Sequence, residues 1–426
     1  MRLLHTSDWH LGRTLHRADL RDAQAGFLDS LVEAVRSERV DAVLVAGDVY
    51  DRAIPPVDAI TLCEDALVRL RAAGASVIVA SGNHDSACRL GFGSRLVDSS
   101  GVYLRTRAAA LAEPVLLADE YGPVAVYAVP YLEPDAVRAQ LPPDPRDGGE
   151  APTDVPRGHA GVLDRATACI RADLDRRGRP RSVVLAHAWV TGAAGSDSER
   201  DISVGGVGCV PASTFAGFDY TALGHLHGQQ TLAEGLRYSG SPLPYSFSEA
   251  HHRKGSWLVE LGADGLVAVE QVAAPTYRPL GVLRGELDDL LTSRQFDTSE
   301  SSFLSVTLTD PTRPADAMAR LRTRFPHVLV LAWEPVGRAP DGRDYRARTV
   351  GRNDLEIAAE FVGHVRGLPP SPAERVLLRT ALDTTRLPAD DVDGMLATGF
   401  LLDGDPYLAP DADPRDAAVR PASRVA

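Results

Sequence analysis

Apolar residues recur along the first two thirds of the chain in two alternating patterns. Continuous apolar runs such as 41–48 (DAVLVAGD) and 75–81 (ASVIVAS) are typical of strands that are buried on both faces. Between these runs, residues 20–38 place large apolar side chains at every fourth position, which predicts an amphipathic helix. A second helix is expected at about 57–73, and further strands are expected at 2–8, 124–130, 182–187, 220–225 and, as a hairpin, 255–272.

This alternation of strands and helices defines the expected fold class. Continuous rather than alternating apolar strands indicate a sheet that helices cover on both faces. We therefore expect an α/β fold over residues 1–275, layered either as α/β/β/α or as α/β/α. Within it, residues 142–158 are rich in Pro, Gly and Asp and are expected to form a surface insertion.

The pattern changes after residue 275, where the apolar segments become shorter. A strand, a helix and a second strand predict a small β-α-β unit, and a polar linker, a pair of helices and a disordered tail are expected to follow. In that order, these parts occupy residues 276–335, 336–355, 356–390 and 404–426.

Composition narrows the class of protein. The chain has 426 residues, more than a single core usually spans, and its 44% apolar and 24% charged residues are typical of a globular protein. No apolar run is long enough to cross a membrane as a helix and the first residues lack a hydrophobic signal, so we expect a cytoplasmic protein. The net charge of −13 argues against binding DNA by charge alone, but it is compatible with an enzyme whose acidic groups hold cations.

The positions of the cysteines and the near absence of lysine each bear on the interpretation of the chain. The cysteines Cys63, Cys88, Cys169 and Cys209 are scattered without a CxxC pair, which predicts free thiols rather than disulfides or a thiolate metal site. The basic residues are arginines with the single exception of Lys254, a bias that we attribute to coding preference and to which we assign no function.

Polar side chains follow five of the predicted strands, at the point where each strand ends. The carboxyl ends of strands in α/β sheets form the crevice in which ligands bind. Imidazole, carboxylate and amide groups without a thiolate are the donors that Mn²⁺, Zn²⁺ or Fe²⁺ prefers. Two such ions about 3.5–4 Å apart would clamp both oxygens of a phosphoryl displacement. The residues are Asp8 and His10, then Asp48 and Asp51, then Asn83, His84 and Asp85, then His187, and finally His225 and His227.

The spacing of these residues suggests individual roles. Residues two apart in an extended segment point the same way, so we expect the DxH and HxH pairs to aim into one pocket. Asp48 is the natural carboxylate to bridge two ions, and His84 is expected to be a general acid that Asp85 orients, with its pKa raised by that carboxylate. Asp51 is as compatible with hydrogen bonding to a ligand as with ligation itself.

Each motif alone has an ordinary explanation as a turn or a satisfied core histidine. It is the ordered set of five, each after a predicted strand, that indicates a metal site. The polar residues of the SEAHHRKG stretch, by contrast, are expected at the surface: Glu249, His251, His252 and Arg253.

The ordered motifs D-x-H, GDxxD, GNHD, H and GHxH resemble those of the calcineurin-like metallophosphoesterases. The flanking stretches MRLLHTSDWHLGRTL, VAGDVYDRAIPP, ALGHLHGQQ and YSGSPLPYSFSE are similar to those of the SbcD nucleases, over residues 1–275. This resemblance implies a four-layer α/β/β/α sandwich with a small α+β capping domain at 276–335 and C-terminal helices. It implies that Asp8, His10 and His227 bind a first ion, that Asn83, His187 and His225 bind a second, that Asp48 bridges them and that His84 is the proton donor. Ala186 stands where the family often has Gly.

The resemblance also implies an activity and partners. It implies two divalent ions, Mn²⁺ first, with Mg²⁺, Zn²⁺ or Fe²⁺ as alternatives, and cleavage of DNA as a 3′→5′ exonuclease on duplex ends and an endonuclease on single strands and hairpins. It further implies a homodimer and an SbcC-type ATPase partner that binds the C-terminal helices. The apolar residues available for that docking are Ile357, Phe361, Val365, Val376, Leu377 and Leu382.

Two other functions are compatible with the same sequence. A metallophosphatase or phosphodiesterase acting on a substrate other than nucleic acid fits the acidic charge, because a nuclease would need metal ions and local arginines, such as Arg13 and Arg89, to approach phosphates. A non-catalytic subunit that regulates an ATPase is the third possibility, and the complete set of ligand residues argues against it.

Overall fold

The computed structural model describes the chain in two separate units. The first unit comprises residues 1–310 and 314–334, and the second contains the C-terminal helices. The described residues are 1–137, 140–147, 158–199, 208–335, 351–366 and 368–384. The expected tail at 404–426, most of the expected linker and the centre of the expected insertion lie outside these residues.

The first sheet has six strands in the order β14-β13-β1-β4-β5-β6. The last four of these run parallel, and β13 and β14 extend the sheet as an antiparallel hairpin. Strands β4 and β5 are almost completely buried, which explains their continuous apolar sequences. The strands are β14 (Gly265–Ala273), β13 (Gly255–Gly262), β1 (Arg2–Thr6), β4 (Ala42–Ala46), β5 (Ser76–Ala80) and β6 (Val102–Arg105).

The second sheet also has six strands, in the order β11-β12-β10-β9-β8-β7. The four inner strands run parallel, and the two outer strands pair with them in the antiparallel sense. The strands are β11 (Gln230–Ala233), β12 (Leu236–Tyr238), β10 (Tyr220–Gly224), β9 (Arg181–His187), β8 (Gly122–Ala128) and β7 (Val115–Asp119).

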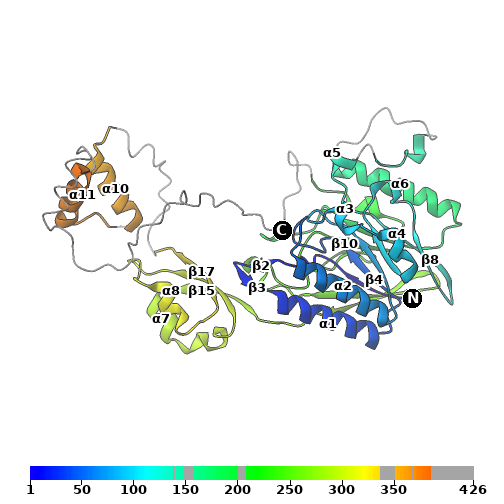
Figure 1. Ribbon diagram of the computed structural model, residues 1–426, viewed down its shortest axis with the longest axis horizontal. Helices are drawn as coiled ribbons and strands as arrows, with labels where there is room; N and C mark the ends of the chain where they lie inside the picture. The colour runs from blue at the N-terminus through cyan, green and yellow to red at the C-terminus, as the bar shows by residue number, and fades with distance from the viewer. Residues whose placement is uncertain (138–139, 148–157, 200–207, 336–350, 367, 385–426) are drawn as a thin grey trace, which may run out of the picture. The chain divides into compact units, whose positions relative to one another are not determined.

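The two sheets pack face to face and helices cover their outer faces (Figure 1). Leu44 and Ile78 of the first sheet share a buried core with Val126 and Leu185 of the second. Helices α1 (Arg21–Ser37) and α2 (Val57–Ala72) pack on the first sheet, and α6 (His159–Arg176) packs on the second. This arrangement confirms the α/β/β/α alternative. Short elements complete the layers: β2 (Thr14–Leu15), β3 (Ala18–Asp19), α3 (Ala87–Leu90), α4 (Ser94–Val97) and α5 (Pro134–Val137).

A third sheet of three parallel strands follows, in the order β15-β16-β17. Its core is separate from those of the large sheets and includes the fully buried Leu290, Leu304, Val306 and Phe325. The sequence predicted the last two strands and the helix between them, but it missed the first strand and helix, because only one residue of the first strand is buried and two of its six residues are glycines. The elements are β15 (Leu280–Gly285), α7 (Leu287–Thr292), β16 (Phe303–Leu308), α8 (Ala317–Arg322) and β17 (Val328–Trp333).

The described part of the second unit contains helices α10 (Asp354–Arg366) and α11 (Pro372–Thr384), which contact each other. Several of their large apolar side chains are exposed; Phe361 is 53% exposed and both Val376 and Leu377 are 64% exposed. Among the described residues, no helix combines the length and apolar character that a membrane span requires.

Candidate metal centre

Five strand ends, three from the first sheet and two from the second, converge on one buried group of polar side chains. The loops after β1, β4 and β5 supply the aspartates, His10 and the GNHD residues, and β9 and β10 supply the remaining histidines. Such burial of charged groups is costly unless they are paired or bind a metal ion. The exposed fractions are at most 2% for Asp8, His10, Asp48, His187, His225 and His227.

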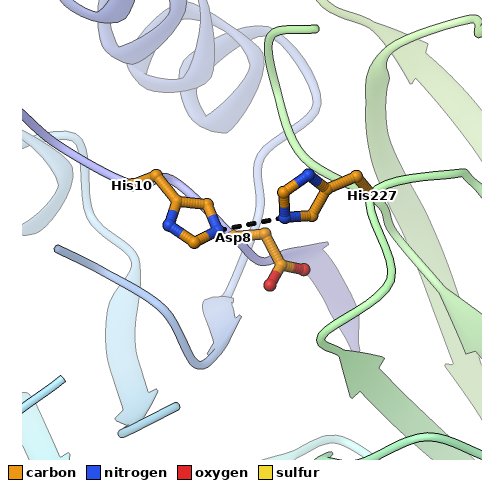
Figure 2. Close-up of side chains that lie close together, drawn as sticks. All are labelled: Asp8, His10 and His227. Atoms are coloured by element: carbon orange, nitrogen blue, oxygen red, sulfur yellow. Dashed lines mark hydrogen bonds between the residues drawn. The ribbon is translucent and has the colours of Figure 1, made fainter. Parts of the chain in front are cut away.

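Asp8, His10 and His227 form the first group of donor atoms (Figure 2). One donor atom from each residue lies within 4.8 Å of those of the other two. The Nε2 atoms of the two imidazoles face each other at 3.0 Å. Two nitrogens bound at right angles to one ion, each at about 2.1 Å, would be about 3 Å apart, so this separation fits a shared metal ion.

Asp48 lies between this group and a second one. Its Oδ2 atom is 3.7 Å from His10 Nε2 and 3.4 Å from His187 Nε2, and its Oδ1 atom accepts a hydrogen bond from the backbone N–H of His84 at 2.8 Å. Burial would raise the pKa of Asp48, but the neighbouring imidazoles, His187 foremost, lower that pKa well below its ordinary value. A carboxylate in this position can contribute a donor oxygen to each of the two groups.

The second group consists of Asn83, His187 and His225. Asn83 Oδ1 lies 2.8 Å from His187 Nε2 and 3.2 Å from His225 Nδ1. His187 Nδ1 donates to the carbonyl oxygen of Ala46 at 2.9 Å, which leaves Nε2 as the atom facing the centre. Burial lowers the pKa of His187, but Asp48 outweighs it and the pKa is raised to about 9, whereas burial lowers that of His225 to about 3. The Nε2 atom of His225 is buried and has no hydrogen-bond partner among the described residues.

Two glycines allow the strand ends to approach so closely. A Cβ atom on Gly82 would overlap the carboxylate and backbone N–H of Asp48, and one on Gly47 would overlap the His187 ring. Gly47 also has a φ of +94°, which side-chain-bearing residues rarely adopt. The glycines of the GD and GN motifs are therefore required by the donor groups beside them.

The backbone at the ligand positions corrects one step of the sequence argument. We expected the DxH pair in an extended segment, but Asp8 and His10 lie beyond β1 with φ values of 53° and 45°. Asp48 and His225 also have positive φ, at 49° and 108°. The side chains converge because the loops turn at residues with left-handed backbone conformations. Such conformations cost free energy, and residues that adopt them cluster at functional sites. Hydrogen bonds between loops hold this shape, including Asp8 N–H to the carbonyl oxygen of Gly47 at 3.0 Å.

His84 lies beside the centre, and its ring is 4.7 Å from that of His10 between centroids. Its Nδ1 atom is 2.7 Å from the carbonyl oxygen of Asp51, which orients the ring. The carboxylate of Asp85 instead accepts hydrogen bonds from the backbone N–H groups of Val49, Tyr50 and Gly82. These contacts differ from the expected Asp85–His84 pair. Through them Asp85 links the GDVYD loop to the GNHD loop. Burial raises the pKa of Asp85 to about 7.

The two candidate phosphate-binding arginines differ in position. The Arg13 guanidinium lies over the Tyr245 ring, 5.0 Å from its centroid, and donates to the carbonyl oxygen of Ser198 at 2.8 Å. It is also 3.7 Å from Asp51 Oδ1, which lies 3.7 Å from His10 Nδ1. The structure therefore brings Arg13 and Asp51 to the rim of the centre. Arg89 is exposed on α3 and lines a separate, largely apolar groove.

The prediction that Glu249 lies at the surface was wrong. Glu249 is 1% exposed and contacts both Ser198 and Lys254. Its Oε1 atom lies 3.5 Å from His227 Nδ1. The available signal was Lys254, the chain's single lysine, which lies five residues after Glu249 and offers a compact ammonium group as its partner. His251, His252 and Arg253 are exposed, as predicted.

Two parts of the chain match known protein families. Residues 1–229, more than half of the chain, match the family described as calcineurin-like phosphoesterase. Residues 276–362 match SbcD_C, described as the type 5 capsule protein repressor C-terminal domain. The first match includes all of the candidate ligands described above.

Three solved structures are similar at low sequence identity. The protein TT1561 of Thermus thermophilus is 14% identical, with 64% of this chain and 99% of that chain covered and a TM-score of 0.36. A dimetal phosphatase from Danio rerio is 16% identical, with 65% and 99% covered and a TM-score of 0.38. GAP50, the anchor in the inner membrane complex of Plasmodium, is 10% identical, with 80% and 98% covered and a TM-score of 0.36.

Proposed function

The chain belongs to the calcineurin-like phosphoesterase family, and from this premise we propose that it is the nuclease subunit of an SbcC–SbcD-type complex. The proposed activities are 3′→5′ exonuclease on duplex ends and endonuclease on single strands and hairpins, in DNA end processing. The observation that carries the proposal is the position of Asp48 between two buried groups of nitrogen and oxygen donors. The family uses a dinuclear metal site, and this arrangement supports one here.

Each group would hold one divalent ion. Asp8, His10 and His227 would bind the first, Asn83, His187 and His225 would bind the second, and Asp48 would bind both. Mixed imidazole and carboxylate donors suit Mn²⁺, and they also accept Zn²⁺, Fe²⁺ or Mg²⁺. When bound, the two ions supply Lewis-acid polarisation of the phosphate and an activated water.

Side chains around this centre would handle the proton and the substrate. The contact of its Nδ1 atom with the carbonyl oxygen of Asp51 would orient His84 to donate a proton to the leaving oxygen. Asp85 would keep the two loops in register through its three backbone hydrogen bonds. Arg13, at the rim of the centre, would contact a DNA phosphate, which a chain of net charge −13 needs in addition to bound cations.

The C-terminal match supports a nuclease over other phosphoesterases, because it extends the likeness to SbcD beyond the catalytic domain. The exposed apolar faces of α10 and α11 would bind an SbcC-type ATPase, since an exposed amphipathic helix pair typically marks a protein partner. A second exposed apolar surface, around α2 to α4, would form the homodimer. It includes Val57 at 79% exposure, Phe92 at 88% and Leu96 at 82%.

Cleavage of a DNA hairpin in the presence of Mn²⁺, with and without an ATPase partner, tests the proposal. Asp8→Asn should abolish cleavage and His84→Gln should slow it about 10²–10⁴-fold, while circular dichroism and the melting temperature show that the fold survives. Cleavage retained by both variants would overturn the mechanism.

The alternative substrate class has one feature in its favour, the net charge of −13, which disfavours approach to nucleic acid. A phosphomonoester and a cyclic nucleotide should therefore be assayed beside the hairpin. Efficient turnover of either, with no cleavage of DNA, would replace the nuclease by a phosphatase or phosphodiesterase on the same metal centre.

A further inference from the structure

Lys254 is the only lysine in the chain, and it is buried behind the metal centre. Its Nζ atom donates to the carbonyl oxygen of His227 at 2.8 Å and to Ser241 Oγ at 2.9 Å. Its third acceptor is the Glu249 carboxylate, and the two side chains form an ion pair in which Lys254 is 8% and Glu249 0% exposed. An ammonium group carries three donors on one atom, whereas the guanidinium of an arginine is a wide planar fork. The site thus uses the residue type that this chain otherwise avoids.

Ser198 connects the ion pair to the ring of His227. Its Oγ atom lies 2.5 Å from His227 Nδ1 and also contacts Glu249 Oε1. Ser198 Oγ also lies 3.0 Å from Ser196 Oγ, but its contact with the Glu249 carboxylate is shorter. A carboxylate paired with an ammonium only accepts hydrogen bonds, so we assign the one hydroxyl hydrogen of Ser198 to Glu249. His227 Nδ1 must then be the donor to Ser198 Oγ, which leaves the lone pair of the ring on Nε2.

The backbone of His227 is held by the same cluster. Its N–H donates to Glu199 Oε1 at 2.7 Å, and its carbonyl oxygen accepts from Lys254. The ring therefore has little freedom to rotate, and its Nε2 atom faces His10 Nε2 at 3.0 Å in the first donor group. Among the candidate imidazole ligands, His187 is oriented in a simpler way, by a single backbone carbonyl.

We propose that Glu249 and Lys254 are positioning residues that act through Ser198 to hold His227 in the tautomer and orientation required to bind the first metal ion. The inference rests on the proposed metal centre and adds residues to it. Partners of this kind fix the orientation of a histidine ligand and increase its basicity, and their loss typically costs about 10–100-fold in metal affinity.

Titration of the full chain with Mn²⁺ by calorimetry tests this role without an activity assay. The wild type should bind two ions. Glu249→Gln should weaken one of the two sites about 10–100-fold, and Ser198→Ala should weaken the same site about tenfold, whereas Ser198→Thr keeps the hydroxyl and should restore wild-type affinity. Because Glu249→Gln leaves Lys254 without its buried partner, Ser198→Ala is the variant that preserves the ion pair and the fold. Asp173→Asn is the matched control. It removes a buried carboxylate of α6 that binds Tyr127, Arg176 and Arg177, and it should leave the affinities of both metal sites unchanged.

Nitrogen-15 NMR of the metal-free protein provides a second readout. His227 should carry its proton on Nδ1 in the wild type and in Ser198→Thr, and should populate both tautomers in Ser198→Ala. The single lysine gives one Nζ signal, which should change in Glu249→Gln and remain in place in Asp173→Asn. Wild-type Mn²⁺ affinity at both sites in Ser198→Ala and Glu249→Gln would overturn the inference and leave the proposed function intact. A wild type that binds two ions but cleaves no DNA would overturn the proposed nuclease and leave the inference intact.

Discussion

The metal centre and the helices α10 and α11 are unusual in opposite ways. At the strand ends, charged and polar side chains such as Asp8 and His10 are completely buried. On the two C-terminal helices, large apolar side chains such as Val376 and Leu377 are mostly exposed. Buried polar groups and exposed apolar groups both cost free energy, and each is tolerated where a binding partner removes the cost. In the proposed function, cations remove this cost at the first region and an apolar protein surface removes it at the second.

The two regions also differ in how firmly the fold holds them. The metal-centre loops are fixed by left-handed residues, glycines and hydrogen bonds between loops, as in the contact of Asp8 with Gly47. The described residues of the helical unit form only a pair of helices, stabilised by contacts such as the ion pair of Arg366 with Glu374. A preorganised site suits small ions with strict geometry, whereas a small helical unit suits docking onto a larger surface.

The largest expected effect separates chemistry from folding at the first region. Replacing His84 by Gln removes the proposed proton donor while keeping a polar side chain of similar size. The rate of hairpin cleavage with Mn²⁺ should fall about 10²–10⁴-fold, as is typical for loss of a general acid. His251→Gln changes an exposed histidine outside the centre and should retain the wild-type rate. Equal rates in both variants would mean that His84 does not contribute to catalysis.

The sequence predicted most of what makes the first region distinctive. The order of motifs at strand ends located Asp8, Asp48 and Asn83 correctly at one edge of the first sheet, because parallel strands in one layer must end on the same side. It did not predict how the residues converge, since the left-handed turns at Asp8 and His10 come from hydrogen bonds between loops far apart in the sequence. Nor did it predict the environment of Glu249, whose partners Ser198 and His227 lie 51 and 22 positions away along the chain.

The sequence was less informative where local pattern and burial disagree. Strand β15 was missed because its sequence, LGVLRG, has glycines at two positions and only Leu283 is fully buried in the sheet. The two C-terminal helices were predicted, since their apolar residues recur at helical spacing. Whether those residues pack inward or remain exposed depends on tertiary contacts that periodicity does not encode.

The second prediction concerns the binding of ions at the first region. Because ions would bind only the folded centre, Mn²⁺ at 100 times its dissociation constant should stabilise the protein by about 2.7 kcal/mol for each bound ion. The change in melting temperature on adding Mn²⁺ measures this effect within each variant, so that differences in baseline stability cancel. Asp48→Asn alters the carboxylate shared by both groups and should remove most of the shift, whereas Asp173→Asn should retain it. A full shift in Asp48→Asn would contradict the bridging role.

The third prediction concerns the second region and its protein partner. Val376→Asp places a charge on the exposed face of α11, where it should cost at least about 1.4 kcal/mol, or tenfold, in affinity for the ATPase. Basal hairpin cleavage by the isolated chain and its melting temperature should not change. Val267→Asp is the matched control, because Val267 is 65% exposed on β14 of the first unit. If both variants bind the ATPase as tightly as the wild type, the α11 face is not the docking surface.

The smallest expected effect tests a buried carboxylate that has a structural role. Asp173 on α6 binds Tyr127, Arg176 and Arg177, and although burial raises its pKa, these contacts, Arg177 foremost, lower it below the ordinary value. A carboxyl group whose folded-state pKa is lowered stabilises the fold above its unfolded pKa of about 3.9, and this contribution is lost as the pH falls through the folded-state pKa. Asp173→Asn should therefore lower the free energy of unfolding by about 1 kcal/mol at neutral pH.

That difference between wild type and Asp173→Asn should shrink as the pH falls below about 4, because the wild-type carboxyl group then becomes neutral as well. Urea unfolding at pH 7 and at several lower values measures it directly. The loss should be independent of Mn²⁺, in contrast to the behaviour of Asp48→Asn, since no candidate ligand is among the contacts of Asp173. A pH-independent difference would show that the loss comes from altered packing on α6 rather than from the charge of Asp173.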